Sequence, residues 1–328
     1  MNRILIFLLV LSACTNKTDY SIVHNIGFAQ GTTYSIKYLG KQDVDHQISI
    51  DSIFSKIDSS LSTYVPYSII SRLNKGERDL ALDSHFIRVF NASSQIAQQS
   101  NGALDCTINP LIELWGFGSQ DTSNVSDQRV QDTLQYTGYH KVSIEDSLLV
   151  MPPNFSLNFN ALAQGYTVDV IAQFLQSKNS SDFLIEVGGE LRASGVNGNN
   201  KWWKVGVDKP IKKPDLSDRF QVVLELENKS LATSGNYRNF YVKDEQIYSH
   251  TIDPITGYPV THTLLSATVV ANSCMLADAY ATAFMVMGVD SVKSFLESNS
   301  EIDAFLVYGE NQIWNTWSSQ GFEERIAD

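Results

Sequence analysis

One acid and one hydroxyl interrupt the apolar segment from Met275 to Met287, and they limit what this chain can fold into. The segment has the length and pattern of a helix, on which Asp278 and Thr282 lie four residues apart and therefore on one face. A carboxylate facing an apolar core costs several kcal/mol unless it is paired or holds a metal ion. The fold must therefore bring Asp278 a partner, either a metal ion or the hydroxyl of Thr282 in mutual hydrogen bonding.

The N-terminus carries the parts of a lipoprotein signal in the expected order. A positive start is followed by an unbroken apolar run from Ile4 to Leu11, and Leu11-Ser12-Ala13-Cys14 matches a cleavage site before an acylated cysteine. The run is too short for a permanent membrane-spanning helix. The alternative is a buried N-terminal strand with an incidental cysteine.

The predicted organisation follows from this signal. We expect a signal peptide at residues 1–13, lipidation at Cys14, a tether over residues 14–25 and one domain over residues 26–328. The expected location is the periplasmic side of a bacterial membrane, held by the lipid, with the inner membrane favoured over the outer. No other segment is long and apolar enough to cross a membrane.

Charge and cysteine content exclude some classes of protein. The net charge of −12 argues against nucleic acid as a partner, because binding it needs a basic surface. Neither a CxxC motif nor a Cys/His cluster indicates zinc or an iron–sulfur centre. Cys106 and Cys274 lie in apolar or motif-rich surroundings, so we expect buried free thiols, although a periplasmic location permits a disulfide.

The order of predicted elements favours an α+β fold with a single compact domain, mixed or antiparallel sheets and flanking helices. No regular alternation of strand and helix is present. Apolar periodicity predicts helices over 44–61, 83–99, 126–136, 162–175, 275–287 and 292–298. It predicts strands over 31–39, 155–159, 183–187, 202–207, 220–227, 231–233, 240–242, 265–271 and 304–308.

Several motifs follow one another along the chain. Gly102 is suited to end a helix, the paired Gly188 and Gly189 allow close backbone approach, and backbone amides at a helix start near Ala161 suit a phosphate. The motifs occupy 61–74, 101–118, 158–169, 184–195, 202–207, 234–240, 249–254 and 277–282. Together, from about Gly31 to the end of the chain, they resemble the FAD:protein FMN transferases, the ApbE-type flavin transferases.

This resemblance implies the residues of a flavin site. The residues that match the family's FAD contacts are Gln30, Tyr64, Ala103, Leu104, Asp105, Asn158, Gln164 and Ile252. Those that match its Mg²⁺ ligands are Ala161, through its backbone oxygen, and Asp278 and Thr282. His250 matches the histidine important for flavin transfer, which fits a general base. Mg²⁺ would also let an acidic chain accept an anionic dinucleotide.

The sequence departs from the family pattern at four of these motif positions. Asn158 stands where aspartate is common, Gln164 where lysine or glutamate is common, Cys106 where isoleucine or valine is common, and Ala281 where some relatives carry a further acid. The side-chain amides of Asn158 and Gln164 can still form hydrogen bonds with a nucleotide. With Ala281 in place of an acid, water or a phosphate of FAD must complete the metal shell.

Other motif residues have structural interpretations. Tyr64 is suited to stacking on a flavin or adenine ring, or is an ordinary tyrosine at the edge of the core. We interpret Trp115 as part of a packed turn, Asp169 as a packing acid and Asp253 as a turn-forming residue.

The resemblance implies Mg²⁺-dependent transfer of FMN from FAD to a serine or threonine hydroxyl of an acceptor flavoprotein, with release of AMP. The expected acceptor is a subunit of a membrane redox complex. Two alternatives stay open. One is an FAD pyrophosphatase, with water as the nucleophile, and the other is a flavin-binding lipoprotein without catalytic activity.

Overall fold

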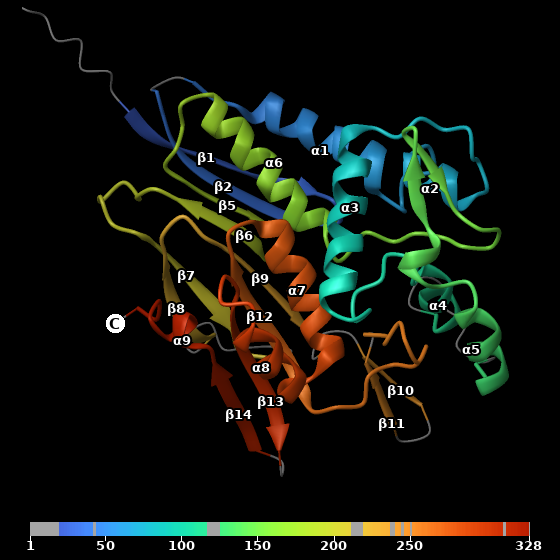
Figure 1. Cartoon of the computed structure of the whole chain (residues 1–328). Helices are drawn as coiled ribbons and strands as arrows, with labels where there is room; N and C mark the ends of the chain where they lie inside the picture. The colour runs from blue at the N-terminus through green and yellow to red at the C-terminus, as the bar shows by residue number, and fades with distance from the viewer. Residues whose placement is uncertain are drawn as a thin grey trace, which may run out of the picture.

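Eight strands form one continuous antiparallel sheet through the molecule (Figure 1). The computed structural model describes residues 20–41, 44–116, 125–210, 219–236, 240–243, 246–249, 251–310 and 313–327. The predicted signal peptide, Cys14 and His250 lie outside these ranges. In sheet order the strands are β1 (Tyr20–Ala29), β2 (Thr32–Lys41), β5 (Phe183–Val187), β6 (Glu190–Ser194), β9 (Ser230–Gly235), β12 (Leu264–Ala271), β13 (Asp303–Glu310) and β14 (Ile313–Ser318).

Helices cover one face of this sheet, and a hairpin packs on the other. The larger helices are α1 (Gln47–Leu61), α3 (Ser84–Gln99), α6 (Ala163–Ser177), α7 (Cys274–Met287) and α8 (Val289–Glu297). The shorter ones are α2 (Ile69–Asn74), α4 (Asn109–Leu114), α5 (Asp127–Leu134) and α9 (Gln320–Glu323). Three hairpins lie outside the main sheet: β3 (Ser143–Glu145) with β4 (Leu148–Val150), β7 (Trp203–Asp208) with β8 (Phe220–Leu226), and β10 (Phe240–Lys243) with β11 (Gln246–Ser249).

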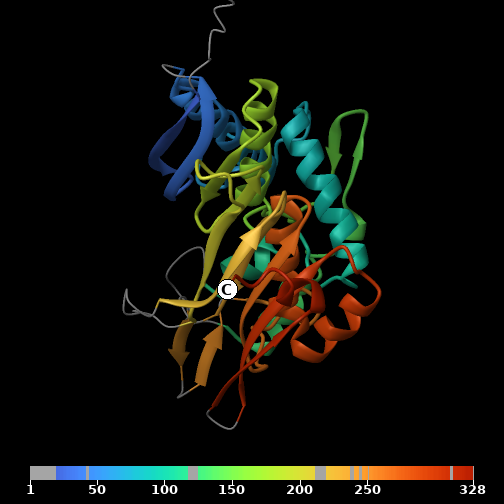
Figure 2. The same ribbon diagram turned by 90° about the vertical axis from the view of Figure 1, so that its left-hand side faces the viewer.

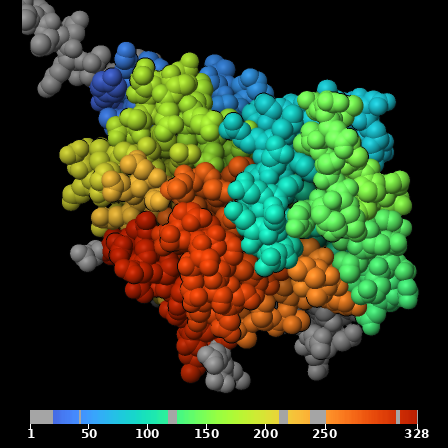
Figure 3. Space-filling view, in the orientation of Figure 1, coloured from blue at the N-terminus to red at the C-terminus, as the bar shows by residue number. Residues whose placement is uncertain are grey.

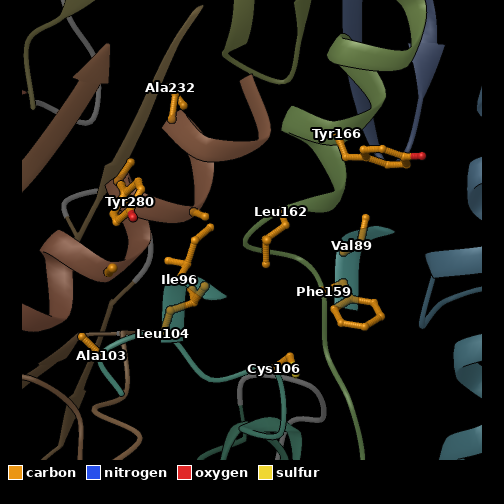
Figure 4. Close-up of a cluster of buried hydrophobic side chains, with 14 of the residues drawn as sticks. Val89, Ile96, Ala103, Leu104, Cys106, Phe159, Leu162, Tyr166, Ala232 and Tyr280 are labelled. Carbon is orange, nitrogen blue, oxygen red and sulfur yellow. The ribbon is translucent and has the colours of Figure 1, made fainter. Parts of the chain in front are cut away.

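Two apolar layers hold the helices against the sheet. Residues of α1 and α6 pack on β2 and β5, and residues of α3, α7 and α8 pack on β9, β12 and β13. Figure 4 shows part of the second layer, where Val89 and Ile96 of α3 approach Leu162 and Tyr166 at the start of α6 and Tyr280 of α7. A third cluster lies between the opposite face of the sheet and the β7–β8 hairpin.

These layers make one compact unit. In the space-filling view the early helices (cyan and green) and the C-terminal residues (orange and red) lie directly against one another (Figure 3). The predicted α+β class with a single domain is therefore confirmed, and the main sheet is antiparallel throughout. None of the helices in the described ranges is long and apolar enough to span a bilayer.

Helices α6 and α7 fix one another through reciprocal bonds at their first turns. The carboxylate of Asp169 on α6 accepts from the backbone N–H groups of Cys274 and Met275 at the start of α7, both at 3.0 Å. In return, Asp278 on α7 accepts from the N–H of Gly165 in the first turn of α6, also at 3.0 Å. Asp169 also pairs with Arg192 of β6, and this confirms its interpretation as a packing acid.

Gly165 permits this close approach of the two helices. A Cβ atom added at this residue would lie 2.4 Å from the carbonyl oxygen of Cys274 and 2.8 Å from Cβ of Asp278. Both distances are shorter than real Cβ contacts, so glycine at position 165 is a packing requirement. Cys274 and Cys106 are both buried and free, as the sequence predicted.

Most predicted elements appear within a few residues of their expected bounds, but the strand predicted at 155–159 is wrong. This segment has no regular structure, because a side chain satisfies its backbone instead of a neighbouring strand. Asn74 donates to the carbonyl of Leu157 and accepts from its N–H, at 2.8 and 2.7 Å. The next N–H, that of Asn158, donates to the carbonyl of Cys106.

Part of the predicted tether also proves to be folded. The strand β1 begins at Tyr20, and its pairing with β2 runs from Tyr20 opposite Lys41 to Ala29 opposite Thr32. Residues 20–25 therefore form part of the sheet, with Asn25 buried and donating to Asp45 at 2.7 Å. The edge strand β14, the strand β6 and the β3–β4 hairpin were not predicted either.

Candidate functional site

Two adjoining cavities, with volumes of about 860 and 530 Å³, lie among helix ends, strand ends and loops. Tyr64 and Asn160 line both, so the two form one branched site. Sites for small molecules and cofactors commonly have volumes in this range. The first cavity is lined from segments far apart in sequence: 63–75, 103–113, 158–162, 234–235, 251–254 and 282–286. The second is lined from segments 30–31, 57–65 and 160–164.

Tyr64 stands between the cavities on a loop that hydroxyl groups hold in place. Ser68 caps α2, and its hydroxyl donates to the carbonyl of Ser62 at 2.7 Å. Ser71 donates to the same carbonyl at 3.2 Å. The Tyr64 side chain is 83 % exposed, which excludes the alternative of a tyrosine buried at the edge of the core. An exposed ring on a fixed loop is suited to stacking on an aromatic ligand.

The loop after α3 lines the first cavity with Ala103, Leu104 and Asp105. The chain turns at Gly102, which has φ of +86°. The buried carboxylate of Asp105 then accepts from the backbone and hydroxyl of Thr107, at 2.7 and 2.6 Å, and from the N–H of Tyr139 at 2.8 Å. The Asp105 side chain therefore holds the loop in place, and this leaves the backbone of the loop to face a ligand.

Residues just before and at the start of α6 line both cavities. Asn158 and Ala161 line the first, and Gln164 lines the second. The side chain of Asn158 is engaged within the protein, since it accepts from the N–H of Asn160 and donates to Asn109. Leu162 offers no side-chain cap to α6, so its first amides depend on other partners.

Asp278 lies behind the wall of the first cavity. Thr282 and Ala161 line that cavity, whereas Asp278 is buried and is not among its lining residues. Burial raises the pKa of Asp278 to about 7, and the bond from Gly165 partly opposes this shift. The predicted alternative of mutual hydrogen bonding with Thr282 is not what the structure shows, because the hydroxyl of Thr282 lies 3.2 Å from that of Ser234.

The oxygen donors near the start of α6 are of the chemical type that a hard divalent cation takes. Within the described ranges, no group of three or more histidine, cysteine or acidic residues forms a metal cluster. The available donors are the carboxylate of Asp278, the hydroxyl of Thr282 and the carbonyl of Ala161. A buried carboxylate with a raised pKa gains most from a cation, and oxygen donors are those that Mg²⁺ prefers. Water or substrate oxygens would complete the shell.

Gln30 and Asp58 form a polar corner in the second cavity. The amide of Gln30 donates to the hydroxyl of Thr167 at 3.0 Å. Its buried oxygen has no hydrogen-bond partner in the described protein, so it is available to a ligand donor. Burial raises the pKa of Asp58, and a hydrogen bond from Gln30 opposes this shift. Asp58 was not predicted from the sequence, because nothing in its local pattern distinguishes it from a surface acid.

Lys75 was also missed, although it directly follows the segment 61–74. It lines the first cavity and supplies a positive charge there, and Glu113 supplies a negative one. Its position immediately after a recognised motif was the available signal. An ammonium group in this cavity is suited to a phosphate.

The segment after β11 brings Ile252 into the first cavity. Ile252 is buried, lines the cavity and forms a bridge with Pro259. Asp253 accepts from the N–H of Ile255 at 2.9 Å, which confirms its role in a turn. The indole of Trp115 donates to the carbonyl of Gly257 at 2.8 Å, and this confirms its structural role. His250 precedes this segment directly, and its own position lies outside the described residues.

Several known proteins similar to this chain are named as flavin transferases. The model of the ApbE family matches residues 30–306. A protein of Vibrio cholerae named FAD:protein FMN transferase is 32 % identical over 98 % of this chain and 97 % of its own length. One of Escherichia coli K12 with the same name is 28 % identical over 96 % of this chain and 92 % of its own.

Solved structures agree with these sequence matches. The flavin transferase ApbE from Vibrio cholerae superposes with a TM-score of 0.82, at 31 % identity, over 94 % of this chain and all of the other. The apo form of the flavinyl transferase ApbE from Pseudomonas stutzeri gives a TM-score of 0.84 at 30 % identity, over 93 % and 97 %. The matched fold, the order of the motifs and the branched cavity agree: this chain belongs to the ApbE family.

Proposed function

We propose that this protein transfers FMN from FAD to a serine or threonine hydroxyl of an acceptor flavoprotein and releases AMP. The observation that carries the proposal is the branched cavity, which gathers the residues matching the family's FAD contacts around Tyr64. Relatives that match this chain over nearly their whole length carry the name FAD:protein FMN transferase. A two-part cavity of about 860 and 530 Å³ fits a ligand with two ring systems joined by a polar linker.

The protein groups around the cavity divide the work of binding. Tyr64 stacks on a ring, and the backbone from Ala103 to Asp105 and the side chain of Ile252 contact the ring edges. The start of α6 beside Ala161 and the ammonium group of Lys75 bind the pyrophosphate, because helix N-termini and ammonium groups both favour anions. Asp278, Thr282 and the carbonyl of Ala161 would hold Mg²⁺, and the ion would neutralise phosphate charge and make AMP a better leaving group.

His250 acts as the general base in this proposal. It takes the proton from the acceptor hydroxyl, whose oxygen forms a new bond to the phosphorus of the FMN half. The bond between that phosphorus and the bridging oxygen breaks, and AMP leaves with the bridging oxygen. Holding the hydroxyl and the phosphorus together in one cavity replaces an encounter in solution with an intramolecular step.

The direct test is to incubate the protein with FAD, Mg²⁺ and candidate redox-subunit proteins and to measure the mass of each acceptor. The expected result is an added FMN on a serine or threonine, with one AMP released per transfer. Release of FMN and AMP without any modified acceptor would identify an FAD pyrophosphatase instead. Binding of FAD without either product would identify a carrier.

Replacing Tyr64 tests the assignment of the ring platform. We expect Tyr64→Ala to weaken FAD binding by about tenfold, since an aromatic pair contributes about 0.5–1.5 kcal/mol beyond the area that it buries. Flavin fluorescence titration measures the affinity. Tyr67→Ala is the matched control, because Tyr67 is also exposed and lies three residues away but lines neither cavity. Equal affinities for the two variants would remove Tyr64 from the site.

We also propose that a lipid on Cys14 anchors the protein at the periplasmic side of a bacterial membrane. The support is the order of charge, apolar run and small residues before Cys14. We expect Cys14→Ser to abolish incorporation of labelled fatty acid and to leave an unprocessed chain, measured by gel mobility after membrane fractionation. Normal labelling of this variant would place the anchor elsewhere.

A further inference from the structure

In the described part of the chain, the outer side of the β1–β2 hairpin carries exposed apolar side chains, although Ile22 also lies against Gly198. Along β1, alternate side chains point away from the helices, and Tyr20, Ile22, Ile26 and Phe28 are among them. Ile26 is 67 % exposed and Phe28 is 73 % exposed. Figure 2 shows the hairpin (blue) at the outer edge of the molecule. A row of exposed apolar side chains on an edge strand favours association with another chain or with a membrane, and proteins usually protect such edges.

The intervening residues show that this orientation is imposed by the fold. Asn25 is buried and bonds to Asp45, and Val23 packs against the cluster between the sheet and α1. A shift of one residue would bury Ile26 and expose Asn25. The register with β2 is continuous over the whole of β1, so the apolar row on its outer side is fixed.

Positive charge accompanies this apolar row. Lys37 and Lys41 of β2 lie on the same side, opposite His24 and Tyr20 of β1. The hairpin, residues 20–41, contains no acid, although the chain has 36 acidic residues against 24 basic ones. The neighbouring acid Glu186, opposite Ser35, is half-buried and accepts from the N–H of Gly189. The face therefore combines exposed apolar side chains with cations on a protein of net charge −12.

We propose that this face, defined by Tyr20, Ile22, Ile26, Phe28, Lys37 and Lys41, lies on an anionic phospholipid surface. The apolar side chains enter the headgroup layer, and the lysines attract anionic headgroups. A strand of ten residues at about 3.4 Å each lies along the surface over about 30 Å. The positive charge favours an anionic membrane over a second copy of this chain as the partner. Two copies that paired through this face would bring the lysines of one copy, Lys37 and Lys41, close to those of the other.

Two features of the chain agree with this orientation. Five residues separate Cys14 from Tyr20, and such a length spans at most about 20 Å, so a lipid on Cys14 would keep β1 near the headgroups. At its other end, β1 leads into Gln30 and Gly31, which line the second cavity. Contact along β1 therefore keeps the end of the second cavity formed by Gln30 and Gly31 within one strand length of the bilayer.

The test separates this face from the proposed lipid. The chain from residue 14 onward, with Cys14→Ser, carries neither the apolar leader nor an acyl group, and the described fold begins at Tyr20. Its binding is measured by co-sedimentation with vesicles of phosphatidylcholine alone or with phosphatidylglycerol added. We expect binding to the anionic vesicles and at least about tenfold weaker binding to the neutral ones. We expect Ile26→Ser with Phe28→Ser to reduce binding by about tenfold or more.

The opposite edge of the same sheet supplies a matched control. Ile313 and Trp314 on β14 are 65 % and 49 % exposed, and we expect Ile313→Ser with Trp314→Ser to leave binding unchanged. We expect Lys37→Glu with Lys41→Glu to abolish the preference for anionic vesicles. Lys56 is exposed on α1, and we expect Lys56→Glu to leave this preference unchanged. An unchanged FAD affinity shows that each variant is folded.

Three outcomes would overturn the proposal. The first is that the unsubstituted chain binds neither kind of vesicle. The second is that both pairs of apolar substitutions reduce binding equally, which would show unspecific adsorption. The third is that gel filtration finds a dimer that Ile26→Ser with Phe28→Ser converts to a monomer, which would make the face an interface between copies. All three are independent of flavin transfer, so they do not bear on the proposed reaction.

Discussion

Replacing Asp278 with asparagine should lower FMN transfer by about 100- to 1,000-fold, the usual cost of losing one charged group that stabilises a transition state. The carboxylate is the one acid among the proposed Mg²⁺ ligands, and it lies buried beside the first turn of α6. Asparagine retains an oxygen that can accept from Gly165 and loses only the charge. The measurement is FMN attachment to the acceptor as a function of Mg²⁺ concentration.

Thermal unfolding separates a metal-binding role of Asp278 from a structural one. Burial raises the pKa of Asp278, so its charged form destabilises the metal-free folded state at pH 8. We therefore expect Asp278→Asn to unfold at the same or a higher temperature than the unsubstituted protein without Mg²⁺. Added Mg²⁺ should raise the unfolding temperature of the unsubstituted protein but not of the variant.

The matched control is Asp290→Asn, which removes an equal charge from an exposed position in the first turn of α8. We expect this variant to keep both its activity and its response to Mg²⁺. If Asp278→Asn retained the Mg²⁺-dependent rise in unfolding temperature, Asp278 would not be a metal ligand.

Replacing His250 with alanine should slow transfer to protein by about a hundredfold or more, the usual effect of losing a general base. FAD affinity should stay within about twofold, because binding is assigned to Tyr64, the 103–105 backbone and the metal. A hydroxyl nucleophile needs activation near neutral pH, and imidazole titrates in that range. Single-turnover transfer measured by in-gel flavin fluorescence gives the rate, and fluorescence titration gives the affinity.

The pH profile makes this prediction specific. In the unsubstituted protein, transfer should rise with pH through the ordinary range of a histidine pKa, about 6.5, because only the neutral ring accepts a proton. The His250→Ala variant should lose this rise. The exposed His140 supplies the control, and His140→Ala should keep both the rate and the profile. Loss of FAD affinity together with rate in His250→Ala would show a binding role for His250 instead.

Helices were predicted well because their signals are local. Asp83 begins α3 by accepting from the N–H of Phe86 at 2.8 Å, and its position before an apolar period is visible in the sequence. The wrong strand at 155–159 shows the limit of local signals. Its apolar residues alternate like those of a strand, but Asn74, 83 residues earlier, forms the hydrogen bonds that a neighbouring strand would have formed.

In the candidate site too, residues with local sequence signals were predicted and residues without them were missed. Tyr64, the 103–105 loop, Ala161 and Thr282, which the motifs singled out, lie on the walls of one cavity. Asp58 and Lys75 were missed because their importance depends on which distant segments face them. A lysine after a helix and an acid on a helix are usually surface residues, and only the folded arrangement distinguishes these two.

The reciprocal bonds between α6 and α7 also determine how much of the chain must fold before a binding site can exist. The bond from Gly165 to Asp278 joins residues 113 positions apart, and the bond from Cys274 to Asp169 joins residues 105 apart. A chain in which α7 has not yet folded contains Tyr64, the 103–105 loop and α6, but it lacks the groups that fix the start of α6. The proposed FAD site is therefore complete only after α7 has docked.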